Sequence, residues 1–192
     1  MVKQLLNKLS KRCRNITLIS LALTITACSS SLDSQTMKKN SPENIVTKHS
    51  NKYFYRLISA EKNGNLGSRK VLQIGRKMAL ESKEIVRGSC WDFIDTIYNR
   101  AGFPNKDRQY VLKGKYRKGP YAKVGDLKAG DWMYYINHGY KNVQHSGIFI
   151  GWIDKSKKRA LVLSYPGQNK KKPGRYREYD LSHVYTIIRP KV

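Results

Sequence analysis

The chain has 192 residues, of which 40% are hydrophobic and 10% aromatic, enough for one packed domain with accessory segments. Its formal net charge of +25 indicates an anionic partner, such as nucleic acid, a phospholipid surface or an acidic polymer. The three cysteines and four histidines show neither a disulfide framework nor the spacing of zinc ligands, so we expect no structural metal and no cofactor.

The N-terminus is typical of an exported protein. Residues 1–14 carry only basic charges, and residues 16–27 form an apolar run that is too short for a membrane span, which needs about 20 residues. The sequence around Ala27-Cys28 is similar to a bacterial lipobox, in which the cysteine becomes the acylated first residue. We therefore predict a signal peptide over 1–27 and a lipid anchor on Cys28, where each buried CH₂ adds roughly 0.8 kcal/mol of membrane affinity.

A polar segment separates this anchor from the folded domain. Residues 28–52 are poor in aromatic side chains and predict a flexible tether, so the domain is expected over 53–192. Ser29 directly after the cysteine resembles lipoproteins that are passed to the outer membrane. We therefore expect a lipid-anchored protein of the cell envelope, and in a diderm bacterium one at the periplasmic face of the outer membrane.

The first predicted helix of the domain covers about residues 68–86. Apolar residues recur there at the spacing of an amphipathic helix, although Gly75 weakens the pattern. The apolar positions are Val71, Leu72, Ile74, Met78, Ala79, Leu80 and Ile85.

A second helix is predicted to begin at Cys90. Ser89 is a good N-cap residue, Asp92 completes a Ser-x-x-Asp capping box, and Gly102 is a natural stop. At the first helical position, free backbone N–H groups and the positive end of the helix dipole favour a thiolate over a thiol. We interpret Cys90 as a nucleophile, because it would be the only free thiol once the signal peptide is removed and Cys28 is acylated.

The remainder of the domain predicts a loop and then strands. Residues 103–126 are rich in Gly, Pro and basic side chains and read as a long, solvated basic loop. Strand-forming residues follow over 132–136, 145–153, 160–164, 176–179 and 184–188. Two helices followed by a run of antiparallel strands predict the α+β class.

Alternation along residues 145–153 separates two faces of that strand. One face carries His145, Gly147, Phe149 and Gly151, and the other carries Ser146, Ile148, Ile150 and Trp152. Glycines on the first face would let another backbone approach closely.

A thiol nucleophile needs a base within hydrogen-bond reach, and His145 is the best candidate. His49 lies in the predicted tether, His138 in an Asn-His-Gly turn, and His183 has no feature that favours it. His145 opens a strand on a glycine-lined face.

Three stretches together resemble the NlpC/P60 family of cell-wall peptidases. They are Ser89-Cys90-Trp91-Asp92-Phe93, Leu127-Lys128-Ala129-Gly130-Asp131-Trp132 and His145-Ser146-Gly147-Ile148-Phe149-Ile150-Gly151. The resemblance covers roughly residues 70–190 and implies a papain-like fold, in which a Cys-bearing helix packs on a small antiparallel β-sheet. It also implies that Cys90 and His145 act as a catalytic pair.

The resemblance places a third polar residue on the strand after the catalytic histidine. Ser164 is the nearest match there, with Gln168 as the alternative. The family usually has Asp-Cys-Ser-Gly-Phe around its cysteine, whereas this chain has Ser89 before the cysteine and Trp91-Asp92 after it.

The resemblance implies hydrolysis of amide bonds in peptidoglycan stem peptides through a thioester on Cys90. Peptidoglycan peptides would be the substrate, the membrane would be a partner through Cys28, and the basic surface would bind anionic envelope polymers.

Three alternatives stay open at this stage. The chain could be a non-catalytic envelope lipoprotein of this fold that binds cell wall or lipid. It could be an amidase or transpeptidase that acts on another wall bond or on a lipid ester. Nucleic-acid binding fits the charge, but no helix-turn-helix, finger or RNP-like motif supports it, so we expect no nucleic-acid partner.

Overall fold

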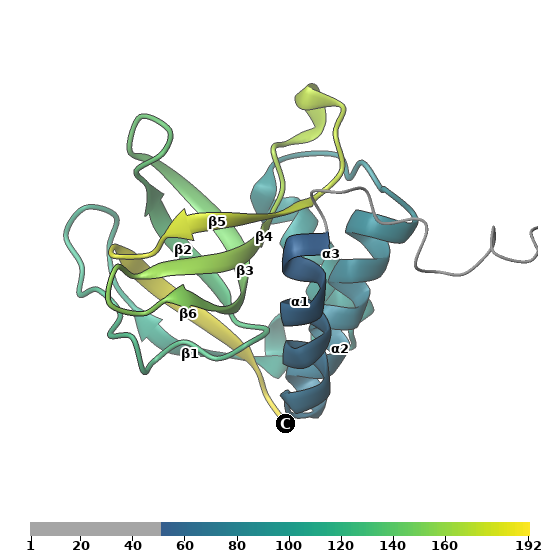
Figure 1. Ribbon diagram of the computed structural model, residues 1–192, viewed down its shortest axis with the longest axis horizontal. Coiled ribbons are helices and arrows are strands. Elements are labelled where there is room, and N and C mark those ends of the chain that lie inside the picture. The colour runs from purple at the N-terminus through teal and green to yellow at the C-terminus, as the bar shows by residue number, and fades with distance from the viewer. Residues whose placement is uncertain (1–50) are drawn as a thin grey trace, which may run out of the picture. The chain divides into compact units, whose positions relative to one another are not determined.

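A computed structural model of the chain describes residues 51–192. The predicted signal peptide over 1–27, the lipidation site at Cys28 and the predicted tether up to residue 50 lie outside the described residues. Within the described part, three α-helices lie on one side of a six-stranded antiparallel sheet, so the class is α+β (Figure 1). No helix between residues 51 and 192 is long and apolar enough to cross a bilayer.

The helices are more numerous and shorter than the sequence pattern predicts. They are α1 (Asn51–Asn63), α2 (Leu66–Arg76), its π-helical continuation η2 (Lys77–Glu81), and α3 (Cys90–Arg100). The helix expected over 68–86 therefore ends at residue 81, and α1 was not predicted. Gly75 lies inside α2, where a Cβ would come within 2.8 Å of Leu163 Cδ2. The absence of a side chain at this position therefore lets α2 pack closely on the sheet.

The sheet has the strand order β1-β6-β2-β3-β4-β5, and all its neighbouring strands pair antiparallel. The strands are β1 (Arg108–Lys113), β2 (Trp132–Asn137), β3 (Val143–Asp154), β4 (Arg159–Ser164), β5 (Arg175–Asp180) and β6 (Val184–Pro190). The five strands predicted from the sequence are all present, with boundaries that differ by at most two residues.

β1 lies in the segment for which the sequence predicts a solvated loop, so that prediction is wrong for residues 108–113. The buried guanidinium of Arg108 donates to the carbonyl of Phe103 at 2.6 Å and to the carboxylate of Asp95 at 2.7 Å. These bonds hold the chain against α3 where it enters the sheet. Most side chains of this edge strand are exposed, so it lacks the buried apolar face that β2, β3, β4 and β6 present.

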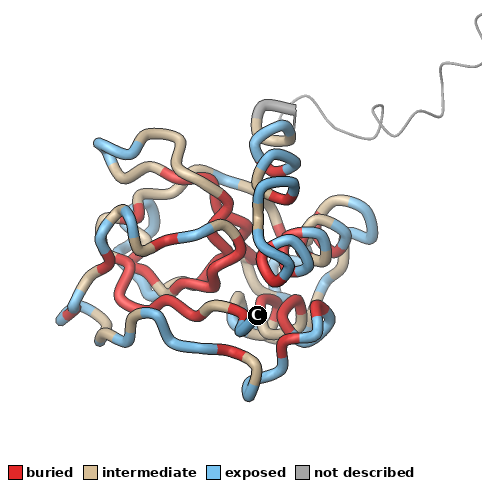
Figure 2. The backbone as a smooth tube through the Cα atoms, turned by 90° about the horizontal axis from the view of Figure 1, so that it is seen from below, coloured by how far each residue is buried: buried red, intermediate tan, exposed pale blue. Residues whose placement is uncertain are grey.

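Two apolar cores lie on opposite faces of the sheet. The larger core fills the space between helices and sheet, with Phe93 and Ile97 from α3 meeting Ile148 and Ile150 from β3. In Figure 2 the buried segments follow the strands, while the outer turns of the helices stay exposed. The helix that begins at Cys90 is therefore fixed on the strand that carries His145.

The second core lies on the other face of the sheet and includes Met133, Tyr135, Phe149 and Val162. The predicted alternation along β3 holds from Ile148 to Ile150, because Phe149 belongs to this second core and its two neighbours to the first. It fails at Trp152, where irregular pairing with β4 turns the indole toward Phe149, with the ring centroids 5.2 Å apart.

Candidate active site

The first turn of α3 presents Cys90 in the geometry that the sequence predicts. The Ser89 hydroxyl accepts a hydrogen bond from the Trp91 backbone N–H at 3.1 Å, and the Asp92 carboxylate accepts one from the Ser89 backbone N–H at 2.7 Å. This is a complete capping box, so the helix begins at Cys90. The thiol is free and only partly buried.

The chain before α3 is held by the loop that follows β4. Gly88 donates its backbone N–H to Gln168 Oε1 at 2.5 Å, and the Gln168 backbone N–H donates back to the Gly88 carbonyl at 2.9 Å. The Tyr165 hydroxyl donates to the Val86 carbonyl at 2.8 Å. Gln168, the alternative third residue, therefore positions the segment before Cys90, and the described residues show no hydrogen bond between Gln168 and His145.

The structure brings Cys90 and His145 together across the contact between α3 and β3. Burial raises the pKa of the Cys90 thiol, but the hydrogen bond with the His145 imidazole and the charge of that ring lower it by more. The resulting pKa is about 7, below the ordinary value of 9.0. A large fraction of Cys90 is therefore thiolate at neutral pH, which is the form that attacks carbonyl carbons.

Ser146 adds to this stabilisation from the strand position next to His145. Both its hydroxyl and its backbone N–H contribute smaller decreases in the Cys90 pKa. The Ser146 hydroxyl is buried and has no partner at ordinary hydrogen-bond distance among residues 51–192. The Ser146 hydroxyl is placed to stabilise the negative charge of the Cys90 thiolate.

Aromatic rings, rather than a carboxylate or an amide, surround the His145 imidazole. Its centroid lies 5.6 Å from that of Tyr135 and 6.1 Å from that of Tyr179. Ser164, the predicted third residue, hydrogen-bonds through its hydroxyl to the Tyr179 hydroxyl at 2.8 Å. Within the described part no hydrogen bond joins Ser164 to His145, so any influence of Ser164 on the imidazole passes through Tyr179.

Two further tyrosines, Tyr134 and Tyr185, lie within electrostatic range of Cys90, and sequence reasoning missed them. Burial raises the pKa of the Tyr134 hydroxyl to about 12, and the negative charge of Cys90 adds a smaller increase. Burial also raises the pKa of Tyr185, again with a smaller contribution from Cys90. Tyr134 therefore keeps its proton at neutral pH and can donate a hydrogen bond near the thiol. Its place in the Tyr134-Tyr135 pair of a predicted strand was the available signal.

The other described histidines lie apart from Cys90. His138 Nε2 lies 2.8 Å from His183 Nδ1, and His138 Nδ1 lies 2.7 Å from Asn142 Oδ1. The two imidazole rings are therefore hydrogen-bonded to each other at the surface. Residues 51–192 contain no cluster of three or more His, Cys, Asp or Glu side chains that could hold a metal ion.

The motif Leu127–Trp132 has a structural part in the site. The Asp131 carboxylate is almost fully buried and accepts two hydrogen bonds from Arg189, from Nε and Nη2, both at 2.7 Å. The Tyr98 hydroxyl donates to the Gly130 carbonyl at 2.7 Å. These contacts fix the start of β2 against β6 and α3.

A cleft of about 1010 Å³ opens beside His145, which lies in its wall, whereas Cys90 is not among its lining residues. Tyr179 from β5 and His138 from the β2–β3 turn also line it. An extended peptide has room in this cleft next to the imidazole.

No protein-family model matches this chain, and no curated protein or solved structure is significantly similar to it.

Proposed function

We propose that the chain is a cysteine hydrolase of the NlpC/P60 type, with a papain-like fold, that cleaves amide bonds in peptidoglycan stem peptides. The observation that carries the proposal is the Cys90 thiol, whose pKa is lowered by His145 to about 7 from its ordinary value of 9.0. A thiolate at the start of a helix, paired with an imidazole beside an open cleft, is the arrangement that acyl transfer requires.

In the proposed reaction the Cys90 sulfur attacks the carbonyl carbon of the scissile amide. The His145 imidazolium gives its proton to the leaving amine as the C–N bond breaks, which leaves a thioester on Cys90. His145 then takes a proton from water, and the water oxygen attacks the thioester and releases the acid. Free N–H groups at the start of α3 and the protonated Tyr134 hydroxyl are the available donors for the oxyanion.

The proposed location follows from the N-terminal sequence. Removal of residues 1–27 and acylation of Cys28 would hold the domain at the membrane, where its substrate lies outside the cytoplasm. The strongly positive charge would keep the domain near anionic polymers of the envelope.

Digestion of purified peptidoglycan fragments tests the reaction. The full chain and its Cys90→Ala variant are incubated with the fragments, and the products are identified by mass spectrometry. We expect new peptide ends from the native chain alone. If both proteins yield the same fragments, or neither yields any, the hydrolase assignment is wrong.

A second candidate is a non-catalytic envelope lipoprotein that binds wall peptides in the same cleft. It is favoured by the surroundings of His145, whose ring meets Tyr135 and Tyr179 and no orienting carboxylate or amide in the described part. Thiol reactivity separates the two candidates, since an activated Cys90 reacts with iodoacetamide at pH 6 and an inert one does not.

A further inference from the structure

The cleft beside His145 carries more positive than negative charge. Arg159, one of its basic side chains, is already paired, with Nε 2.8 Å from Glu178 Oε1. The carboxylate of Asp180, also in the wall, accepts hydrogen bonds from the backbone and hydroxyl of Ser182. The acidic groups of the wall are therefore engaged.

Three other cations of the same cleft have no such partner. Among the described residues, no hydrogen bond or ion pair engages the side chains of Lys170, Arg175 or Arg177. Arg175 is the most informative, because its Nε atom is buried and still lacks an acceptor. A buried donor on a charged group is costly to leave unsatisfied, so its position is explained by an acceptor that a ligand brings.

Strand geometry places these arginines on the same side of the sheet as the imidazole. Tyr176 packs against the helix-side core, so its neighbours Arg175 and Arg177 point to the other face of β5. Tyr179, which contacts the His145 ring, shares that face with them. Arg175 pairs with Ser164, which pairs with Gly147, so its backbone lies two strand spacings, roughly 10 Å, from that of Gly147.

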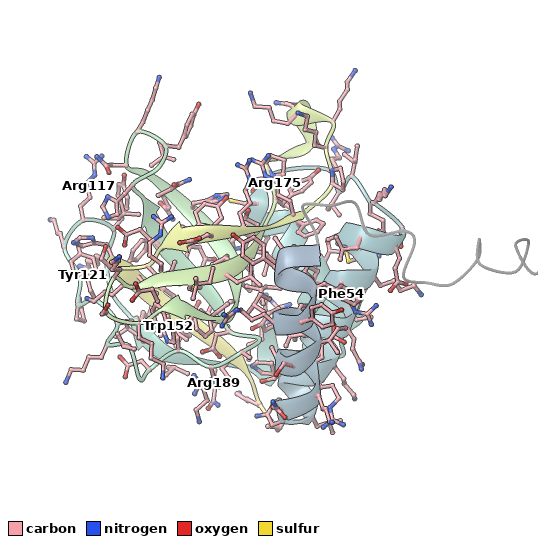
Figure 3. All side chains as sticks on the ribbon, viewed as in Figure 1. Phe54, Arg117, Tyr121, Trp152, Arg175 and Arg189 are labelled. Atoms are coloured by element: carbon pink, nitrogen blue, oxygen red, sulfur yellow. The ribbon has the colours of Figure 1, made fainter. Side chains whose placement is uncertain are left out.

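The helix that carries Cys90 also fixes the position of Arg175. A Cβ at Gly174 would lie 2.5 Å from Phe93 Cζ, so β5 begins in direct contact with the first turns of α3. Figure 3 shows Arg175 at this end of β5, next to the loop that follows β4. The backbone at the start of β5 is therefore fixed against the first turn of α3.

We propose that Arg175, with Arg177 and Lys170, forms a binding site for a carboxylate of the substrate in the cleft that His145 also lines. This inference rests on the proposed function, because it is the acyl substrate of Cys90 that carries the carboxylate. Arg175 donates hydrogen bonds to the carboxylate through its planar fork, and the two exposed cations attract the carboxylate from solvent.

Affinity labels test this site without knowledge of the natural substrate. N-iodoacetyl-glutamate and its diamide alkylate the same thiol and differ only in charge, and iodoacetamide reports the reactivity of Cys90 itself. With the full chain we expect alkylation by the glutamate label to exceed that by the diamide by about tenfold, the effect of one charge-assisted hydrogen bond.

The variants assign that preference to residues. Arg175→Gln should remove most of it, Arg175→Lys should restore part of it, and Arg177→Gln should reduce it by about threefold, as an exposed charge does. The reaction with iodoacetamide should not change in any of them. Lys172→Gln, an exposed cation of the same loop outside the cleft wall, is the matched control and should keep the full preference.

Two outcomes overturn the proposal and leave the hydrolase assignment standing. One is equal labelling by the charged and neutral reagents. The other is an Arg175→Gln variant that loses reactivity toward all three reagents alike. Failure of iodoacetamide itself to react would instead overturn the activated thiol, and the carboxylate site would then be judged by NMR. In that measurement the Arg175 Nε–H signal should shift on addition of N-acetylglutamate and stay fixed with N-acetylglutamine; no shift with either contradicts the site.

Discussion

Two polar pairs in this domain each join residues that are far apart in the chain, and they differ in how completely they are satisfied. Asp131 and Arg189 share two hydrogen bonds, the Lys128 backbone N–H adds a third to the carboxylate, and Arg189 also donates to the Asp126 carbonyl. Cys90 and His145 are only partly buried, His145 lines a cleft, and the Ser146 hydroxyl lacks an ordinary partner among residues 51–192.

The difference separates a structural pair from a reactive one. A closed, fully hydrogen-bonded pair has no remaining group to offer a ligand, whereas the open pair has a proton that moves near neutral pH. The variants below test this division.

Removal of the imidazole should have the largest effect. In His145→Ala, Cys90 loses its main source of stabilisation as a thiolate, and hydrolysis should fall by about 10²- to 10⁴-fold with the loss of the base. The rate of alkylation by iodoacetamide should rise with pH through a midpoint of about 7 in the native protein, and this midpoint should move toward 9.0 in the variant. Equal midpoints in the two proteins would show that His145 does not activate the thiol.

Removal of one member of the structural pair should affect stability instead. Asp131→Ala leaves the mostly buried Arg189 without its carboxylate, so the free energy of unfolding in urea should fall by about 3–5 kcal/mol. The double variant Asp131→Leu/Arg189→Met removes both charges and should recover most of the loss. Where Asp131→Ala remains folded, iodoacetamide should alkylate Cys90 at the native rate; a decrease would mean that the two pairs are coupled.

Tyr134→Phe tests the donor proposed for the oxyanion. Its hydroxyl is protonated at neutral pH and lies near the thiol, so hydrolysis should fall by about 100-fold, as on removal of one oxyanion donor. Alkylation, which forms no oxyanion, should continue at the native rate. A parallel loss of both activities would place Tyr134 in the support of Cys90.

Ser164→Ala tests the third residue suggested by the family resemblance. Because the Ser164 hydroxyl contacts Tyr179 and not the imidazole, hydrolysis should fall by less than about tenfold, the effect of one neutral hydrogen bond. Tyr179→Phe removes the same bond from the other side and is the matched comparison. A loss as large as that of His145→Ala would establish Ser164 as a member of a triad.

Loss of the helix cap should have the smallest effect. Ser89→Ala removes the acceptor for the Trp91 N–H and should cost about 1 kcal/mol of unfolding free energy, measured in urea. The pKa of Cys90 should change little, because the His145 ring provides most of its decrease. A shift as large as that in His145→Ala would mean that the helix terminus dominates.

Features of the sequence that act locally predicted their part of the structure well. The capping box around Cys90 involves residues three apart, and β2, β3, β4 and β6 each bury at least one face, so pattern alone located them. Helix α1 was missed because we assigned its first residues to the tether. Strand β1 was missed because its order comes from contacts of Arg108 with α3.

The chemistry around the pair could not be read in the same way. The rings of Tyr135 and Tyr179 contact His145 from two other strands. Arg175 becomes a candidate ligand-binding residue only once the structure shows that it has no acceptor for its Nε atom and that the nearby Glu178 is paired with Arg159. The sequence contains thirteen tyrosines and 38 basic residues, and no pattern in it singles out Tyr135, Tyr179 or Arg175.

The contact at Gly174 restricts how this domain can diversify. Any other residue at that position would have to displace the Phe93 ring, and the helix that bears the thiol would move away from the strand that bears Arg175. One methyl group would thus change the spacing between the proposed nucleophile and the proposed carboxylate site. Descendants of this chain that adopt new substrates are expected to vary the arginines and to keep this glycine.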